Sequence, residues 1–479
     1  MARACGLGLL LALLLPMVGT SVPGTVVRLN KAMLNYVSET GKAPLQRALQ
    51  VTVPHFLDWS GEVLQPSRVQ ILNVQVSRLD LNFIAGFGIR MLVAANFTFK
   101  VFRVPEPLEL VLPVVLVADA RVAPDSIRTP VVSISTCSSF FNNAIVLDGN
   151  HSTALLVRVQ RHIKAVLRNK LCLSISNLVQ NLNVHLGTLI GLNPVGPESQ
   201  IRYFMISAPN ITNDYISLDI SAVLFLLGKP IVLPVNATRF MLPEHVGTDS
   251  AMATVGLSQD MFDSVLLLLQ KAGTLNMDIT GQLKSDNNPL NTSVLGLLIP
   301  EITHQFPQPM SVVLKVRLGA TPMVILHTNN ATLQLQPFVE VLAVTSNSAF
   351  QSLFSLNVAV NLSLQLSVSK VKLQGITSVL GDVKLTVASS NVGFIDVSVG
   401  LRSPEVPSLG GGGLTPGEGT DQVHAQIGTV FEKPLLDHLN ALLGMGIALP
   451  NVVSLYYLNA EIFVHEGYVV VSSKLLYEH

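Results

Sequence analysis

The chain has 479 residues, of which 49% are hydrophobic and 13% charged, and its formal net charge at pH 7 is zero. An average domain carries about 25% charged residues, so this chain has a large apolar core or an apolar surface that faces a ligand. Residues 22–227 carry 17 Lys and Arg against 12 Asp and Glu, and residues 248–479 carry 10 against 17, which is a mild dipole and excludes the dense basic face of a nucleic-acid-binding protein.

The first 21 residues have the pattern of a secretory signal peptide. Arg3 provides the positive charge, residues 7–15 form a short apolar run, and small residues at 19–21 offer a cleavage site. This run is too short to span a membrane, and the best later candidate, 221–235, is interrupted by a lysine and prolines. We therefore expect a secreted, extracellular protein.

Removal of residues 1–21 leaves two cysteines, Cys137 and Cys172. An even number of cysteines in a secreted chain indicates a disulfide, here between a strand or loop and a long helix. The closed loop would span 35 residues (172 − 137), for which the chain-entropy model gives about 3–4 kcal/mol of stabilisation.

N-x-S/T triplets without proline also agree with export. They begin at Asn96, Asn150, Asn210, Asn236, Asn291, Asn330 and Asn361. Each triplet is frequent by chance, so the set indicates a glycoprotein without selecting a particular site.

Hydrophobic periodicity divides the first half of the chain into elements. Val26, Leu29 and Met33 share one helical stripe, and the long run after residue 155 has apolar residues three and four apart. Between these stretches, apolar and polar residues alternate, which indicates a half-buried antiparallel sheet. The predicted elements are a helix at 25–49, strands within 68–122, a helix at 155–186 and strands at 201–208 and 215–225.

Residues 228–247 contain three prolines and no clear period, which indicates a linker that lies against the body of the protein. After it, the predicted elements are helices at 259–273, 295–306 and 423–445 and strands at 311–318, 331–344, 355–374, 379–394 and 460–477. Residues 397–420 are rich in glycine and proline and are predicted to be a flexible insertion.

Two ungapped matches indicate an internal duplication. Residues 27–37 match 255–265, and residues 162–167 match 438–443. The order of helices and strands is also the same in both halves. We therefore predict two like domains, 22–227 and 248–479.

Several segments resemble the bactericidal/permeability-increasing (BPI) family, which includes lipopolysaccharide-binding protein, plasma lipid-transfer proteins and the PLUNC proteins. The similar segments are 23–29, 136–139, 168–172, 255–259, 298–302, 389–394 and 462–477. They follow one another over nearly the whole mature chain and are most similar to the long PLUNC branch. The resemblance implies an α+β boomerang of two domains, each a twisted antiparallel sheet wrapped around a long helix, joined by a central sheet. It also implies a Cys137–Cys172 disulfide and an apolar pocket for phospholipid acyl chains in each domain.

A slot for acyl chains needs apolar side chains and no unpaired polar groups, and the helical stripes offer such side chains. The candidates are Val26, Leu29, Met33, Val159, Ile163 and Val166 in the first half and Met261, Val265, Leu439 and Leu442 in the second. Met33 and Met261 occupy matching positions of the repeat, and methionine adapts to irregular ligands.

The chain departs from the bactericidal members of the family in its charge. Those members concentrate lysines at the tip of the N-terminal domain, whereas the basic residues between Arg47 and Arg128 are few and scattered here. We therefore expect no strong, charge-driven binding of lipopolysaccharide.

The sequence leaves two classes of function open. A lipid-binding protein would hold phospholipid or another amphipathic lipid in its pockets, act at bacterial or host membrane surfaces and serve innate defence at mucosal surfaces. A surface-active or protein-interaction glycoprotein would have closed pockets and no lipid cargo. Enzymatic chemistry is not indicated, because the chain has no G-x-S-x-G elbow and Val469 replaces the second histidine after His465-Glu466. We predict no cofactor, no metal and no nucleic-acid partner.

Overall fold

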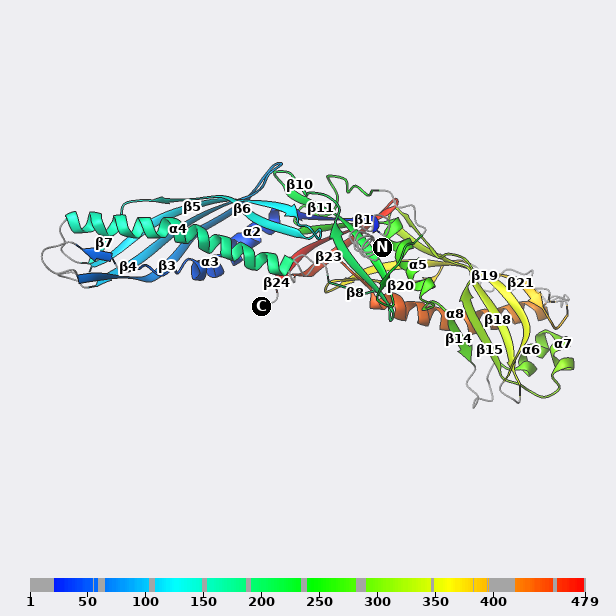
Figure 1. Ribbon diagram of the computed structural model, residues 1–479. Coiled ribbons are helices and arrows are strands. Elements are labelled where there is room, and N and C mark those ends of the chain that lie inside the picture. Colours follow the sequence, from blue (N-terminus) through cyan, green and yellow to red (C-terminus); the bar gives the residue numbers. More distant parts are fainter. Residues whose placement is uncertain are drawn as a thin grey trace, which may run out of the picture.

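The computed structural model describes residues 21–54, 56–58, 65–102, 108–148, 153–186, 191–233, 239–280, 290–345, 349–381, 383–393, 395, 418–450 and 455–477. Within these ranges, the strands form three antiparallel sheets along an elongated molecule (Figure 1). The predicted α+β architecture of two sheets with long helices and a central joining sheet is confirmed.

The N-terminal sheet explains the alternating pattern between residues 68 and 122. Its strands are β2 (Phe56–Asp58), β3 (Gln65–Ile84), β4 (Gly88–Phe102), β5 (Leu108–Pro124), β6 (Pro130–Phe141) and β7 (Ile145–Asp148). Helix α4 (Thr153–Leu186) runs along this sheet (Figure 1). Every fourth residue of α4 from Val159 to Leu171 is fully buried against alternate residues of β4 and β5. The predicted strands and long helix are thus confirmed.

The central sheet is built from both halves of the chain. Its strands are β1 (Ser21–Asn30), β8 (Asn193–Pro194), β9 (Ser199–Met205), β10 (Asn210–Ile211), β11 (Tyr215–Leu226), β12 (Lys229–Pro230), β13 (Ala253–Ser258), β23 (Leu455–His465) and β24 (Tyr468–Tyr477). Val27 of β1 lies opposite Val255 of β13 in antiparallel register. These two residues match in the internal repeat, so a local twofold axis passes between them. Strand β11 flanks β1 as β24 flanks β13.

The prediction of one helix at 25–49 is wrong for its first residues. Residues up to Asn30 belong to β1, and the helix is split into α2 (Lys31–Thr40) and α3 (Lys42–Ala48). Strand β1 pairs on both edges. Both of its faces are also covered, because Val27 packs in the main core and Val26 packs with Leu242 and Val470, so both valines are buried. A strand buried on both faces loses the alternation by which strands are recognised.

The C-terminal sheet contains β14 (Met277–Thr280), β15 (Val312–Leu318), β16 (Met323–His327), β17 (Asn330–Leu335), β18 (Pro337–Val344), β19 (Phe350–Ser369), β20 (Lys372–Val379), β21 (Lys384–Ser390) and β22 (Ile447–Ala448). Its helices are α5 (Gln259–Lys271), α6 (Thr292–Leu298), α7 (Pro300–Gln305) and α8 (Glu418–Met445). The single strand predicted at 460–477 is wrong: it is the hairpin β23–β24, with a turn at Gly467, whose φ is 77°. Strand β16 was not predicted.

The end of the predicted linker, residues 239–247, packs on the outer face of the central sheet. Phe240 and Leu242 join a small apolar cluster with Val26 and Val470. The Arg28 guanidinium donates hydrogen bonds to the carbonyls of Leu242 (N···O 3.1 Å), Pro243 (2.9 Å) and Glu244 (3.0 Å). Of the predicted signal peptide, residues 1–20 lie outside the described ranges, as do residues 397–417 of the predicted insertion; Glu418 begins α8.

Candidate functional site

An apolar cavity of about 370 Å³ lies between α2, the C-terminal half of α4 and the N-terminal sheet. Nearer the tip of the domain, Phe97 and Phe99 fill the space under α4 and are fully buried. At the cavity, β5 instead contributes Ala118 and Ala120. The smaller side chains leave the space between helix and sheet unfilled.

The cavity opens where its wall is only partly buried. Val37 of α2 is 37% exposed, and Val132 of β6 and Val179 of α4 are half-buried. The 21 lining residues include no charged side chain. Their polar groups are the hydroxyls of Tyr36 and Thr40, one turn apart on α2. The Thr40 hydroxyl donates to the Tyr36 carbonyl (2.9 Å).

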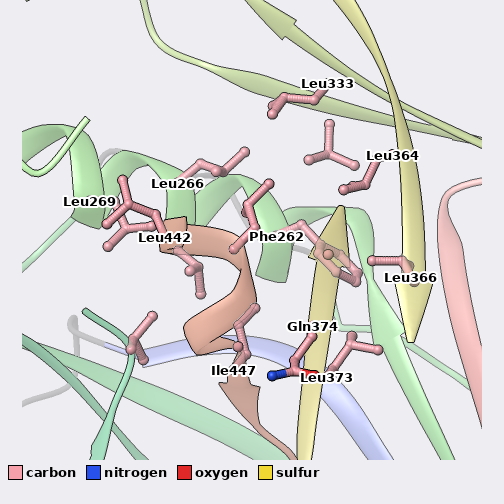
Figure 2. A pocket seen from close by; sticks show the side chains of 16 residues that line it. Phe262, Leu266, Leu269, Leu333, Leu364, Leu366, Leu373, Gln374, Leu442 and Ile447 are labelled. Carbon is pink, nitrogen blue, oxygen red and sulfur yellow. The ribbon is translucent and has the colours of Figure 1, made fainter. Parts of the chain in front are cut away.

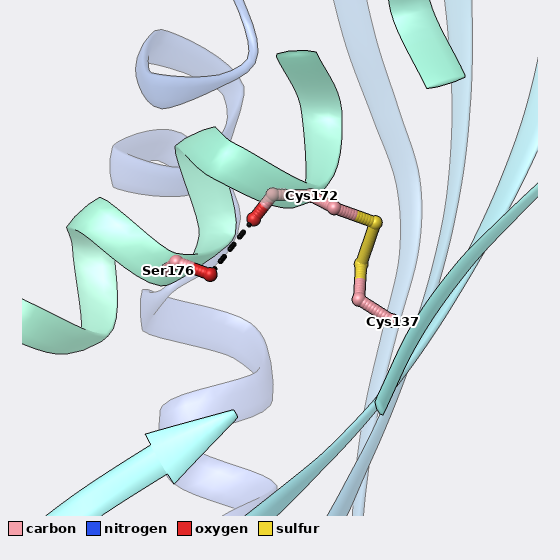
Figure 3. Close-up of a disulfide and its surroundings, with 3 residues drawn as sticks. All are labelled: Cys137, Cys172 and Ser176. Atoms are coloured by element: carbon pink, nitrogen blue, oxygen red, sulfur yellow. Dashed lines mark hydrogen bonds between the residues drawn. A yellow bond between two sulfur atoms is a disulfide. The ribbon is translucent and has the colours of Figure 1, made fainter. Parts of the chain in front are cut away.

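The predicted disulfide is confirmed, and it fixes one wall of the cavity. Figure 3 shows Cys137 on β6 bonded to Cys172 on α4, with a Cα–Cα distance of 5.8 Å. A second tie lies further along the same pair of elements. The Asn183 side chain of α4 accepts from the Val132 backbone N–H (2.8 Å) and donates to its carbonyl (2.7 Å). The spacing between β6 and α4 is therefore held at two points.

The C-terminal half has a much smaller cavity, of about 50 Å³, at the contact of α5, α8 and strands β19 and β20. Figure 2 shows Phe262, Leu266 and Leu442 projecting toward its centre. A core cavity of about 150 Å³ holds a single benzene ring. The smaller cavity therefore does not admit an acyl chain in this conformation.

The predicted pocket residues do not all lie together. Leu29 and Met33 line the larger cavity, and Val265 and Leu442 line the smaller one. The other six belong to packed clusters: Val159, Ile163 and Val166 on the face of α4 that packs on the N-terminal sheet, Met261 and Leu439 in the main core, and Val26 in the small cluster with Leu242 and Val470. Their stripes hold the helices to the sheets.

Sequence reasoning missed the strand residues of the cavity wall. Ala118, Ala120 and Val132 line it from β5 and β6, and Leu218 lines it from β11. The signal that could have found them is the pair of alanines in an otherwise large-residue alternation. Small residues at inward-facing positions indicate a place where side chains do not fill the space between the helix and the sheet.

The glycosylation candidates differ in exposure. Asn96, Asn210, Asn330 and Asn361 are exposed. The Asn291 side chain instead accepts from the Val294 N–H (2.7 Å) at the start of α6. Asn150 and Asn236 lie outside the described residues.

The histidines of the repeat contact the backbone. His162 contacts the Pro54 carbonyl (3.1 Å), and His438 contacts the Thr274 carbonyl (2.8 Å). Each contact joins a long helix to the segment after the first helices of its half. No cluster of three His, Cys, Asp or Glu side chains suited to a metal occurs in the described ranges.

Three basic residues of the N-terminal sheet are paired with carboxylates. Arg90 forms a two-point contact with Asp119 (2.7 and 3.0 Å), which lowers the pKa of that carboxyl. Lys100 pairs with Glu109 (2.7 Å), as Arg78 does with Asp80 (2.5 Å). These pairs reduce the positive field that a lipid phosphate would meet.

Comparison with known proteins identifies the family. The family model of the LBP / BPI / CETP N-terminal domain matches residues 33–182 of this chain, and the family model of the C-terminal domain matches residues 196–400. BPI fold-containing family B member 2 of Homo sapiens is 73% identical over 480 residues and that of Mus musculus 62% identical over 485 residues, each match covering 100% of both chains. The crystal structure of lipopolysaccharide binding protein has the same fold, with a TM-score of 0.61 at 20% identity, covering 96% of this chain and 100% of that one. In agreement with the resemblance of its segments, the chain belongs to the LBP / BPI / CETP family.

Proposed function

We propose that this protein binds the acyl part of an amphipathic lipid in the cavity of its N-terminal half. The observation that carries the proposal is the open cavity of about 370 Å³ with no charged lining residue. Small-molecule pockets typically measure about 300–1,000 Å³ and are mostly apolar. Burial of each methylene gives about 0.8 kcal/mol, so a chain of about twelve methylenes gains roughly 10 kcal/mol before the entropic cost of binding.

The same cavity favours a lipid carrier over a glycoprotein with closed pockets. In a protein with closed pockets, side chains would fill the space between α2, α4 and the sheet. Val37 would then be packed in the core and would not line an opening. Membership in a family of lipid-binding proteins supports the same function. We also propose that the protein acts in innate defence at mucosal surfaces.

Secretion is also part of the proposal. The pattern of residues 1–21, the sequons and the Cys137–Cys172 bond all fit an oxidising, extracellular compartment. No helix within the described ranges is both long and apolar enough to cross a membrane. We propose 22–227 and 248–479 as the two domains, joined by the segment 228–247.

Filling the cavity should remove the lipid. Ala120→Phe places a ring in the cavity, and overpacking typically costs 1–3 kcal/mol, so bound lipid in the secreted protein should fall about tenfold. Ala94→Phe is the matched control, because Ala94 lies on the other face of the same sheet and does not line the cavity. Native mass spectrometry with lipid extraction measures the effect. Equal lipid in both variants would place the ligand elsewhere.

Lipopolysaccharide binding should be weak and nearly independent of salt. Paired surface charges contribute little to binding at physiological ionic strength, so the affinity of the full-length protein should change less than about threefold between 50 and 300 mM NaCl. Surface plasmon resonance on immobilised lipopolysaccharide measures this. Tight binding that is lost at high salt would contradict the prediction. A variant with Arg161, Lys164 and Arg168 replaced by Gln would then test whether α4, which has no acidic residue, provides the charge.

A further inference from the structure

We infer that the cavity accepts one single-chain amphiphile with an uncharged, hydroxyl-bearing head, of the monoacylglycerol class, rather than a two-chain phospholipid. This inference rests on the proposed function, because it specifies the ligand of the same cavity. It is carried by the volume of the cavity, by the rigidity of its walls and by the polar groups at its mouth.

The volume suits one chain. A cavity of about 150 Å³ accepts one benzene ring of six carbons. On the same scale, 370 Å³ accommodates about 15 carbons, which is one chain of palmitoyl length. A phospholipid with two such chains has twice that number of chain carbons. The second cavity, of about 50 Å³, cannot take the other chain.

The walls do not widen freely. The disulfide and the Asn183–Val132 hydrogen bonds hold β6 against α4 on both sides of Ile134, which lines the cavity. Leu475 of β24 lies in the lining as well, and β24 pairs with β13 within the central sheet. A second chain would have to break one of these connections or displace α2, which forms the opposite wall.

The mouth offers hydroxyls but no charge. Tyr36 lines the cavity, and its hydroxyl has no hydrogen-bond partner among the described residues. Of the two lysines of α2 and α3, Lys42 is paired with Glu39 (2.9 Å), and Lys31, at the start of α2, does not line the cavity. A phosphate or carboxylate held in this mouth would lack a counter-charge, which is costly when water is excluded. A glycerol hydroxyl or ester can instead exchange a hydrogen bond with Tyr36.

The test is a competition in the full-length, delipidated protein. An equimolar mixture of monopalmitoylglycerol, palmitoyl lysophosphatidic acid and dipalmitoyl phosphatidylcholine is offered in neutral detergent, and native mass spectrometry counts the lipids bound. We expect one monopalmitoylglycerol per chain, at least tenfold preferred over each of the other two. Equal or preferred binding of either competitor, or two lipids per chain, would overturn the inference while leaving the proposed function intact. Binding of none of the three would refute both.

A separate variant tests the proposed contact between the lipid head group and the Tyr36 hydroxyl. Tyr36→Phe keeps the ring in the cavity wall and removes the hydroxyl, so affinity for monopalmitoylglycerol should fall about three- to tenfold. Tyr468→Phe, on the central sheet and outside the cavity lining, should change nothing. Unchanged affinity of the Tyr36→Phe protein would exclude the hydroxyl contact.

Discussion

Replacing Cys137 and Cys172 by alanine should lower the free energy of unfolding of the N-terminal half by about 4 kcal/mol, because the unfolded chain is no longer closed into a loop. The loop spans 35 residues between β6 and α4. Denaturant unfolding followed by circular dichroism measures the loss. Reductant added to the wild-type protein should cause at least two-thirds of this loss of unfolding free energy. Reductant should not change the unfolding free energy of the variant. A loss below about 1 kcal/mol would show that other contacts already order the unfolded segment.

Replacing Arg28 by methionine should cost about 3 kcal/mol and release the segment 239–247 from the central sheet. Arg28 is only 5% exposed and lies over the Tyr215 ring at 4.2 Å. Burial lowers the pKa of its guanidinium, which stays protonated at neutral pH. Methionine fills similar space but leaves three carbonyls without their donor, and each unsatisfied buried group costs about 1–3 kcal/mol. Two of these hydrogen bonds are only partly buried, so the cost of each carbonyl stays near the lower end of that range and the three together cost about 3 kcal/mol.

The release can be measured as faster proteolysis at Arg239 or Met241 and as a lower unfolding midpoint. Arg161→Met is the control, because Arg161 is an exposed arginine on α4. Equal protease sensitivity of the two variants would mean that Phe240 and Leu242 hold the segment without Arg28.

The best-predicted parts of the fold are those with one buried face. Buried and more exposed residues alternate from Val93 to Phe102 in β4 and from Leu108 to Ala118 in β5, and α4 repeats its buried residues every four positions from Val159 to Leu171, because each presents one face to the core. Strand β1 was predicted as a helix because both of its faces and both of its edges are covered, so its sequence does not alternate. The turn in β23–β24 was missed although the polar residues His465 and Glu466 and the glycine Gly467 interrupt the apolar run there.

The cavity was harder to predict than the fold for a physical reason. A helical stripe tells which residues face the sheet, but not whether the sheet fills the space beneath them. Val159 and Ile163 share their stripe with residues near the cavity, yet they pack on phenylalanines, whereas Val179 further along α4 lies over alanines. The difference depends on the partner strand, and pairing of distant strands is not visible in one stretch of sequence.

The pairing of β1 with β13 also bears on the origin of the chain. Each strand meets the copy of itself at the same position, Val27 opposite Val255, which is the isologous contact of a twofold dimer. Two copies of a one-domain ancestor could have made this contact between separate chains, and fusion through the segment now at 228–247 made it intramolecular. Association between separate chains depends on the protein concentration. Fusion instead gives the two halves a fixed effective concentration for each other. A single half cut from the present protein would expose a fully buried strand edge, so it should aggregate or pair again with another copy rather than stay monomeric.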